Sequence, residues 1–132
     1  MARIKIDLPE TFSFTTEIKI RITDLNYGSH VGNDSFLSLL HEARVQYLAQ
    51  HDLAELSDEG PGLIMTDAAI EFKKELNYGD TAIIHVTADD INNFSFTIFY
   101  LIEKVSGDKK ETVAKAQTNM LKYDYKLKKV MR

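Results

Sequence analysis

Apolar and polar residues alternate over residues 12–22, at the start of the chain. One parity carries mostly apolar side chains and the other carries polar ones, and Thr16 is the one polar break in the apolar parity. This period of two predicts a strand with one buried face, and the apolar members are Phe12, Phe14, Ile18, Ile20 and Ile22. If the strand continues, Asp24 and Asn26 share this parity and point towards the same side.

The next regular segment, residues 35–53, has the spacing of a helix. One narrow arc carries Phe36, Leu40, Ala43 and Tyr47. Most other directions are also apolar, through Leu37, Leu39, Val45 and Leu48. A helix of this kind is usually covered by other structure. Asn33 or Asp34 is the predicted N-cap, because short polar side chains accept hydrogen bonds from the N–H groups of a first helical turn.

Four further runs are predicted strands, at residues 63–73, 81–89, 94–104 and 111–123. A loop at Ser57–Gly62 precedes them, and Asn77–Asp80, Asn92–Asn93 and Ser106–Asp108 are turn signals between them. Short connections imply antiparallel neighbours. The chain, residues 1–132, is therefore expected to form a single α+β domain in the order β-α-β-β-β-β, with one long helix against a five-stranded antiparallel sheet. The edges of such a sheet favour a homodimer.

Composition and charge narrow the function classes. The net charge of −4 argues against nucleic acid as a partner. Without cysteine there is no disulfide, thiol catalysis or thiolate metal site. No segment has the apolar length of a signal peptide or a membrane span, so we expect a cytoplasmic protein with no membrane partner. A late basic cluster, either a solvated tail or a phosphate-binding patch, comprises Lys122, Lys126, Lys128, Lys129 and Arg132.

The polar stretch 24–34, DLNYGSHVGND, lies between the first strand and the helix. His30 falls in irregular backbone, and the first helical turn offers unpaired N–H groups that suit a developing oxyanion. Glu42 lies on a polar or small arc of the helix. Each also has a simpler interpretation, His30 as a loop histidine bonded to backbone and Glu42 as an exposed helix glutamate. The histidines show no spacing that predicts a metal site.

The tripeptide Asn-Tyr-Gly occurs twice, at 26–28 and at 77–79. The second copy lies between two predicted strands and leads into Asp80, so it is most simply a hairpin turn. The first copy lies between strand and helix, where His30 and Asn33 follow it. Only the first copy is therefore a candidate for chemistry.

The pattern Asp24-x-Asn26-x-x-Ser29-His30-Val31-Gly32-Asn33-x-x-Phe36, followed by Glu42-Ala43-Arg44, resembles the signature of hotdog-fold acyl-CoA thioesterases. The similar groups are the 4-hydroxybenzoyl-coenzyme A thioesterase-like family and the plant acyl-acyl-carrier-protein thioesterases. The likeness continues through Phe72, Tyr78-Gly79-Asp80, Ala116-x-Thr118, Leu121 and Asp124, so it spans residues 12–126.

This resemblance implies a helix wrapped by a five-stranded sheet, paired as a homodimer or a dimer of dimers with active sites at the dimer interface. The implied reaction is hydrolysis of an acyl-CoA or acyl-carrier thioester to a carboxylic acid and a free thiol. No cofactor is implied beyond the coenzyme A of the substrate. Two alternatives stay open: a non-hydrolytic acyl-CoA-binding or regulatory hotdog domain, and another hotdog activity such as a dehydratase.

The sequence departs from the family pattern at its catalytic carboxylate. That position is Asn26, and an amide is neither a nucleophile nor a general base at neutral pH. Ser29 and Gly32 also depart from the pattern. The base is then expected to be Glu42, with His30 second and Asp24 third, while Asn26 orients the water or the thioester carbonyl. The expected oxyanion donors are the backbone N–H groups of Val31, Gly32, Asn33 and Asp34.

Substrate contacts are expected from Tyr27 and Phe36. For the coenzyme A phosphates the candidates are Lys73, Lys74, Lys126 and Lys128. An acyl pocket has apolar candidates that are equally ordinary core residues, namely Phe36, Leu39, Leu40 and Tyr47. The identity of the acyl chain is open from the sequence.

Overall fold

The computed structural model describes residues 1–56 and 61–131. Two predicted features fall partly outside the described residues: Ser57–Gly60 of the loop after the helix, and Arg132 of the basic cluster. In chain order the described elements are β1 (Phe14–Lys19), the 3₁₀ helix η1 (Ile22–Asp24), α1 (Asn33–Ala49), β2 (Pro61–Phe72), β3 (Thr81–Asp89), β4 (Ser95–Ser106), β5 (Lys109–Asp124) and β6 (Lys129–Val130).

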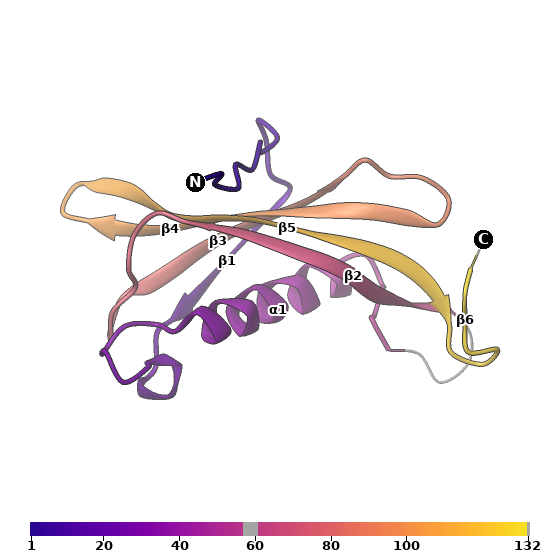
Figure 1. Ribbon diagram of the computed structural model, residues 1–132, viewed down its shortest axis with the longest axis horizontal. Coiled ribbons are helices and arrows are strands. Elements are labelled where there is room, and N and C mark those ends of the chain that lie inside the picture. Colours follow the sequence, from indigo (N-terminus) through magenta and orange to yellow (C-terminus); the bar gives the residue numbers. More distant parts are fainter. Residues whose placement is uncertain (57–60, 132) are drawn as a thin grey trace.

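The strands form one antiparallel sheet in the order β1-β3-β4-β5-β2, and the two-residue β6 pairs with β5. The long strands β4 and β5 pass over α1, which lies along one face of the sheet (Figure 1). The predicted order β-α-β-β-β-β and the hotdog architecture are confirmed. The sixth strand was not predicted, because a two-residue pairing leaves no periodic signal in the sequence.

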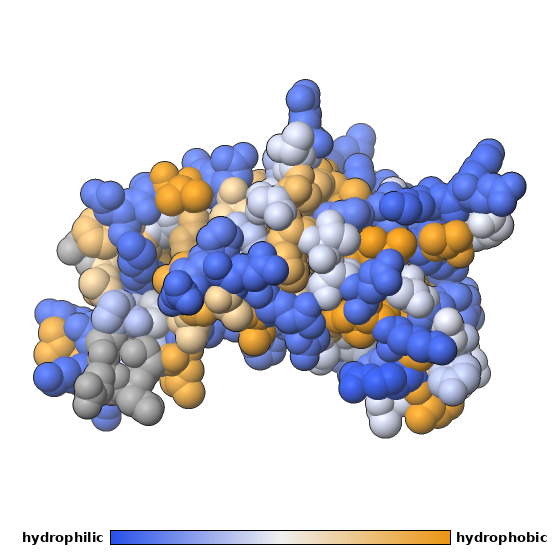
Figure 2. All heavy atoms as spheres, turned by 180° about the vertical axis from the view of Figure 1, so that it is seen from behind, coloured by the Kyte–Doolittle hydropathy of each residue, from blue (hydrophilic) through white to orange (hydrophobic). Residues whose placement is uncertain are grey.

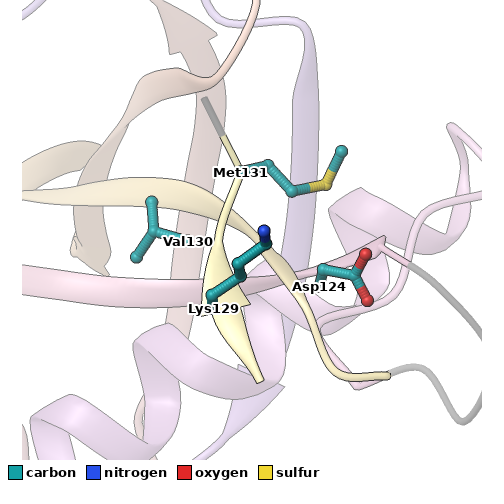
Figure 3. A pocket seen from close by; sticks show the side chains of 4 residues that line it. All are labelled: Asp124, Lys129, Val130 and Met131. Carbon is teal, nitrogen blue, oxygen red and sulfur yellow. The ribbon is translucent and has the colours of Figure 1, made fainter. Parts of the chain in front are cut away.

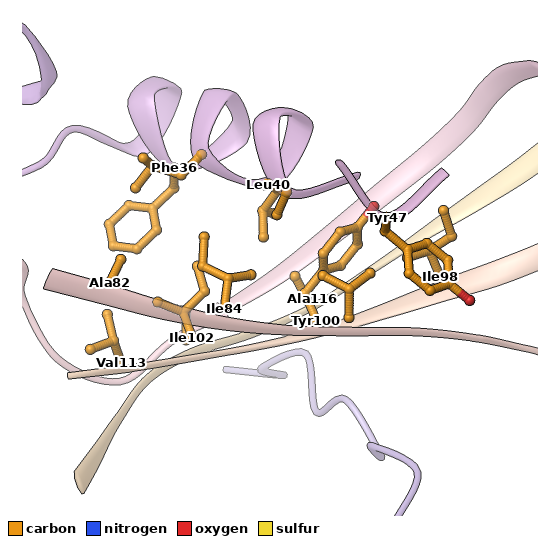
Figure 4. Packing of buried hydrophobic residues seen from close by; sticks show 14 of the residues in the cluster. Phe36, Leu40, Tyr47, Ala82, Ile84, Ile98, Tyr100, Ile102, Val113 and Ala116 are labelled. Carbon is orange, nitrogen blue, oxygen red and sulfur yellow. The ribbon is translucent and has the colours of Figure 1, made fainter. Parts of the chain in front are cut away.

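The core lies between α1 and the facing side of the sheet (Figure 4). Phe36, Leu40 and Tyr47 project from the helix towards the strands, and each is at most 6% exposed. The sheet contributes Ala82, Ile84, Ile98, Tyr100, Ile102, Val113 and Ala116, all fully buried. Burial of a large apolar side chain contributes about 1.5–3 kcal/mol. The four candidates for an acyl pocket are therefore core residues of this chain.

The helix is covered on one side only by the described residues, which differs from the expectation of a wrapped helix. Leu37 and Val45 remain 45% and 48% exposed. Met65 on the edge strand β2 is also 45% exposed. Apolar residues are likewise interspersed with polar ones on the face of the molecule seen in Figure 2. A single chain thus leaves apolar surface on α1 and on β2.

The first strand ends earlier than predicted. After Lys19 the chain enters η1, and Ile22 is 69% exposed instead of lying on the buried face. The cause is local, because the Asp24 carboxylate accepts the backbone N–H of Arg21 at 2.8 Å and thereby caps the 3₁₀ turn. Asp24 is consequently buried and Asn26 is exposed, so the prediction that both point to one side is wrong.

Candidate active site

Asn26 organises the loop between η1 and α1. Its Oδ1 accepts the N–H of Gly28 at 2.8 Å and that of His30 at 3.4 Å. Its own backbone N–H donates to the carbonyl of His30 at 2.7 Å, and Ser29 takes a left-handed conformation with φ of 68° to close the turn. The amide oxygen of Asn26 therefore accepts hydrogen bonds within the loop. The side-chain NH₂ group of Asn26 is the part that can donate to a ligand.

His30 is held by the second Asn-Tyr-Gly copy. Its Nδ1 lies 2.9 Å from Oδ1 of Asn77 and 3.4 Å from a carboxylate oxygen of Glu75. Both partners are acceptors, so the hydrogen-bond network assigns the ring proton to Nδ1 and leaves a lone pair on Nε2. Residues 77–80 do form a turn, closed by the Asp80 N–H to Asn77 carbonyl bond of 3.1 Å. The prediction of a hairpin at this place is wrong, because β2 pairs with β5 while β3 pairs with β1 and β4. The second role of this turn, beside His30, was missed, since the contact joins residues 47 positions apart.

The helix starts differently from the prediction. Its N-cap is Gly32, with no side-chain cap, and neither Asn33 nor Asp34 takes that place. In the described part of the chain the N–H groups of Asn33, Asp34 and Ser35 have no hydrogen-bond partner. A Cβ added at Gly32 would lie 3.5 Å from the Asn26 Cβ, so the open helix end adjoins Asn26.

Two of the four predicted oxyanion donors already donate hydrogen bonds to backbone carbonyl groups. The N–H of Val31 donates to the Leu76 carbonyl at 3.0 Å, and that of Gly32 donates to the Asp24 carbonyl at 3.4 Å. The N–H groups of Asn33 and Asp34 are the two that the described residues leave available. They point along the helix axis at its positive end, which is the geometry that stabilises an anion.

Asp24 is an anchor in this arrangement. It is 5% exposed, and its two carboxylate oxygens accept bonds from the Arg21 backbone at 2.8 Å and the Arg21 guanidinium at 3.2 Å. Burial by itself raises the pKa of Asp24, but the hydrogen bonds and charge of Arg21 outweigh burial and hold that pKa below its ordinary value. A carboxylate engaged in this way is a poor proton acceptor for catalysis.

Glu42 lies on the exposed side of α1, in a groove between β1 and the helix. One oxygen, Oε2, accepts from Nε2 of Gln46 at 2.8 Å. Lys19, Arg21 and Ser38 line the same groove. Since a helix rises about 1.5 Å per residue, Glu42 is about 12 Å along α1 from Asp34. Within one chain the structure therefore brings Asn26, His30 and the helix start together, and leaves Glu42 apart from them.

Of the two predicted substrate contacts, Phe36 and Tyr27, one is buried and the other is exposed. Phe36 is 3% exposed and packs edge-on against Phe72, with ring centroids 5.2 Å apart. Tyr27, in contrast, is completely exposed on the loop. Phe36 thus belongs to the core, and Tyr27 is accessible to a ligand.

The four lysine candidates do not converge within one chain. The N–H groups of Lys73 and Lys74 both donate to the Val113 carbonyl, near the start of β5, while Lys126 follows Asp124 at its end. At about 3.3 Å per residue these two ends are about 36 Å apart along the strand. Figure 3 shows the second end, where Asp124 of β5 and Lys129 of β6 are among the residues that line a pocket.

Two further findings concern the described residues as a whole. Residues 1–56 and 61–131 contain no group of three or more histidine, aspartate or glutamate side chains placed to hold a metal ion. No helix within the same ranges has both the length and the apolar character needed to cross a membrane.

Comparison with solved structures supports the fold. The 1,4-dihydroxy-2-naphthoyl-CoA thioesterase of Synechocystis superposes with a TM-score of 0.79 at 23% identity, covering 89% of this chain and 87% of that one. At this level of identity the likeness concerns the fold. It agrees with the helix and sheet order described above.

Sequence comparison reaches the same group of proteins. A protein of Aquifex aeolicus provisionally named an esterase is 28% identical over 91 residues, which are 67% of this chain and 66%, just under two thirds, of that protein. A Bacillus subtilis protein, provisionally named acyl-CoA thioesterase YneP, is 26% identical over 94 residues, covering 70% of this chain and 68% of that protein. The family model of the thioesterase-like superfamily matches residues 20–132. The chain belongs to the thioesterase-like superfamily.

Proposed function

We propose that this protein hydrolyses acyl-CoA thioesters to coenzyme A and a carboxylic acid, at a site built from the loop 24–34 and the start of α1. The observation that carries the proposal is the uncapped helix end: in the described part of the chain the N–H groups of Asn33 and Asp34 have no partner, and the N-cap Gly32 adjoins the Cβ of Asn26. The names of the Synechocystis and Bacillus subtilis relatives support an acyl-CoA substrate. The cytoplasmic location stays a prediction.

The reaction follows from these groups. A water attacks the thioester carbon while a base takes its proton, and the carbonyl oxygen becomes an oxyanion that the helix N–H groups stabilise. The NH₂ group of Asn26 donates to the same oxygen or to the water. The tetrahedral intermediate then collapses and the C–S bond breaks. The coenzyme A sulfur leaves as a thiolate and takes up a proton from the base or from water.

Glu42 is the proposed base, and its position requires a second protomer. It lies about 12 Å along the helix from Asp34 in its own chain, which is too far to share one reacting carbon with the N–H groups there. The half-exposed Leu37 and Val45 on α1 and Met65 on the edge strand β2 offer apolar surface for a homodimer. In the proposed dimer, Glu42 of one protomer faces the helix start of the other.

His30 is the second candidate base. Its Nε2 carries the lone pair, and the histidine is directly bonded through its backbone to Asn26, so it needs no partner chain. This difference gives the two candidates distinct consequences. A base from the partner makes the active site depend on the dimer, whereas His30 makes each chain self-sufficient.

Thiol release from a panel of acyl-CoAs tests the function. Glu42→Gln is expected to lower kcat by about 10²–10⁴-fold with little change in KM, and His30→Gln is expected to lower it much less. Glu17→Gln is the matched control, because Glu17 lines the same groove from β1. Full activity of Glu42→Gln together with loss of activity in His30→Gln would transfer the role of base to His30.

A mixture of inactive variants tests the shared site. Asn33→Pro removes one helix N–H at a position that tolerates proline, and Glu42→Gln removes the base. If each site uses both chains, dissociated and reassociated mixtures should regain about a quarter of wild-type activity, since half the dimers are mixed and carry one intact site. A mixture that stays inactive would place all the machinery in one chain.

The alternative function is acyl-CoA binding without hydrolysis. The observation that favours it is Asn26 at the position of the family's catalytic carboxylate, with its oxygen already committed to Gly28 and His30. Tight binding of acyl-CoA without thiol release from any member of the panel would establish this alternative and overturn hydrolysis.

A further inference from the structure

Thr16 interrupts the apolar face of β1 at a position that a β-branched apolar residue would fill well. It pairs in register with Ile84, which is completely buried in the core, so Thr16 lies on the side of the sheet that α1 covers. Its hydroxyl donates to Oε1 of Gln46 on the helix at 2.6 Å. The polar break in the sequence pattern therefore corresponds to a specific contact between strand and helix.

This contact fixes the orientation of the Gln46 amide. With Oε1 accepting from Thr16, the other end of the amide, Nε2, donates to Oε2 of Glu42 at 2.8 Å. The reversed amide would place its oxygen against the carboxylate, where neither group has a proton to donate. One orientation satisfies all three side chains, and it directs a donor at the carboxylate.

We propose that Thr16 and Gln46 are positioning residues for Glu42, an inference that rests on the proposed function of that carboxylate. Gln46 holds Oε2, so Oε1 is the oxygen left to take the proton from water. An exposed glutamate otherwise samples many rotamers, and a carboxylate held in place spends more time in the reactive geometry. The two hydrogen bonds, from Thr16 to Gln46 and from Gln46 to Glu42, thus restrain the Glu42 carboxylate relative to the sheet.

The variant Thr16→Val separates this role from a structural one. Valine has the shape of threonine and suits an apolar position in a strand, so thermal stability should be unchanged or higher. Without the hydroxyl, Gln46 is free to turn, and kcat should fall about 3- to 10-fold at unchanged KM, as expected for the loss of one orienting hydrogen bond. Thr16→Ser keeps the hydroxyl and should retain most of the wild-type kcat.

Thr15→Val is the matched control. Thr15 is the neighbouring residue of β1, and its hydroxyl contacts Nδ1 of His85 at 2.8 Å instead of the helix. This variant should keep the wild-type kcat. Equal losses in Thr15→Val and Thr16→Val would overturn the inference, as would a Thr16→Val protein with wild-type kcat.

A second measurement does not depend on turnover. In the wild-type protein the side-chain NH₂ resonances of Gln46 should differ from those of the exposed Gln50, and in Thr16→Val they should move towards them. Gln46 resonances that stay unchanged in Thr16→Val would overturn the positioning role. If the wild-type protein releases no thiol from any acyl-CoA, the proposed function fails, and these resonances alone decide whether Thr16 orients Gln46.

Discussion

Nδ1 of His30 lies 2.9 Å from Oδ1 of Asn77, and this bond joins the loop before α1 to the turn before β3. The two loops are also joined through the backbone, by the Val31 N–H to Leu76 carbonyl bond of 3.0 Å. The two Asn-Tyr-Gly copies therefore act as neighbours in space. The first copy forms the loop that carries His30, and the second holds its ring.

Replacement of Asn77 tests this relationship. Asn77→Ala removes the nearer of the two acceptors of Nδ1 and leaves the Glu75 carboxylate at 3.4 Å. The preference of the His30 ring for the tautomer protonated on Nδ1 should therefore weaken, and kcat/KM should fall about 2- to 10-fold. Asn77→Asp keeps an acceptor at the same place and should preserve the tautomer. Side-chain ¹⁵N resonances of His30 report the tautomer directly. Identical spectra for the alanine and aspartate variants would contradict the assigned role.

Gly32 is expected to trade stability for activity. Its φ of −70° and ψ of 159° suit any residue. An added Cβ would lie 2.6 Å from Oδ1 of Asp34, so the Asp34 side chain has to rotate away, and 3.5 Å from the Asn26 Cβ, which is an ordinary contact. Gly32→Ser supplies the missing cap and should stabilise the protein by a few tenths of a kcal/mol, about the usual gain over glycine. The serine oxygen would occupy a helix N–H needed for the oxyanion.

The kinetic expectation for Gly32→Ser is a kcat about 10-fold lower, below the loss for complete removal of an oxyanion donor. Urea unfolding and thiol-release kinetics on the same sample check both parts. Gly32→Ala adds a Cβ without a capping oxygen and is the control, expected to keep most of the activity. A serine variant that is more stable and fully active would exclude these N–H groups from catalysis.

Periodicity in the sequence predicted the helix and the long strands well. It failed where a single polar contact determines the residue at which an element ends. The alternation through Ile22 is real in the sequence, yet the strand ends at Lys19 because Asp24 bonds back to Arg21 within the same turn. The N-cap was misassigned to Asn33 or Asp34 on residue type. Neither side chain caps the helix, and the backbone of Gly32 begins it.

The candidate site was predictable in part for a related reason. Its loop residues are consecutive, so Asn26, His30 and the helix start were found from one stretch of sequence. Asn77 contacts His30, which is 47 residues away in the sequence, and Gln46 contacts Thr16, which is 30 residues away. No local sequence pattern predicts contacts of this kind. Thr16 was recognisable in the sequence as the one polar residue on an apolar face. Its contact could be identified only once the structure placed Gln46 opposite it on the helix.

Acid should weaken the anchor of the loop. Because the pKa of Asp24 is held below its ordinary value of 3.8, its contribution to stability is present above about pH 4 and is lost as pH falls through the lowered value. Asp24→Asn should be less stable than wild type at pH 7 and should lose less stability between pH 4 and pH 2, since its side chain does not titrate there. Urea unfolding at a series of pH values measures the difference.

Arg21→Ala is the companion variant for this test. It removes the guanidinium that bonds Asp24 at 3.2 Å but leaves the backbone N–H bond at 2.8 Å. Its pH dependence should therefore lie between those of wild type and Asp24→Asn. Three parallel stability curves would show that the Arg21–Asp24 pair does not couple to folding.

The buried Arg44 should make Glu55 important for stability. Arg44 is 6% exposed, and its guanidinium donates to Glu55 at 3.0 Å and to the Tyr100 hydroxyl at 3.2 Å. Burial lowers the pKa of Arg44, but Tyr100 and Glu55 outweigh burial, so the group stays charged and needs its partners. Glu55→Ala should cost about 2–3 kcal/mol, somewhat less than a fully buried pair because Glu55 keeps contact with water.

His41→Ala is the matched control for Glu55→Ala. His41 contacts the other oxygen of the same carboxylate at 3.1 Å, but its side chain is 59% exposed. An exposed contact of this kind contributes at most about 1 kcal/mol, so His41→Ala should unfold close to the wild-type urea midpoint while Glu55→Ala unfolds well below it. Equal midpoints for the two variants would mean that the stability of the protein does not depend on the Arg44–Glu55 pair, and that the hydrogen bond from Arg44 to the Tyr100 hydroxyl is sufficient.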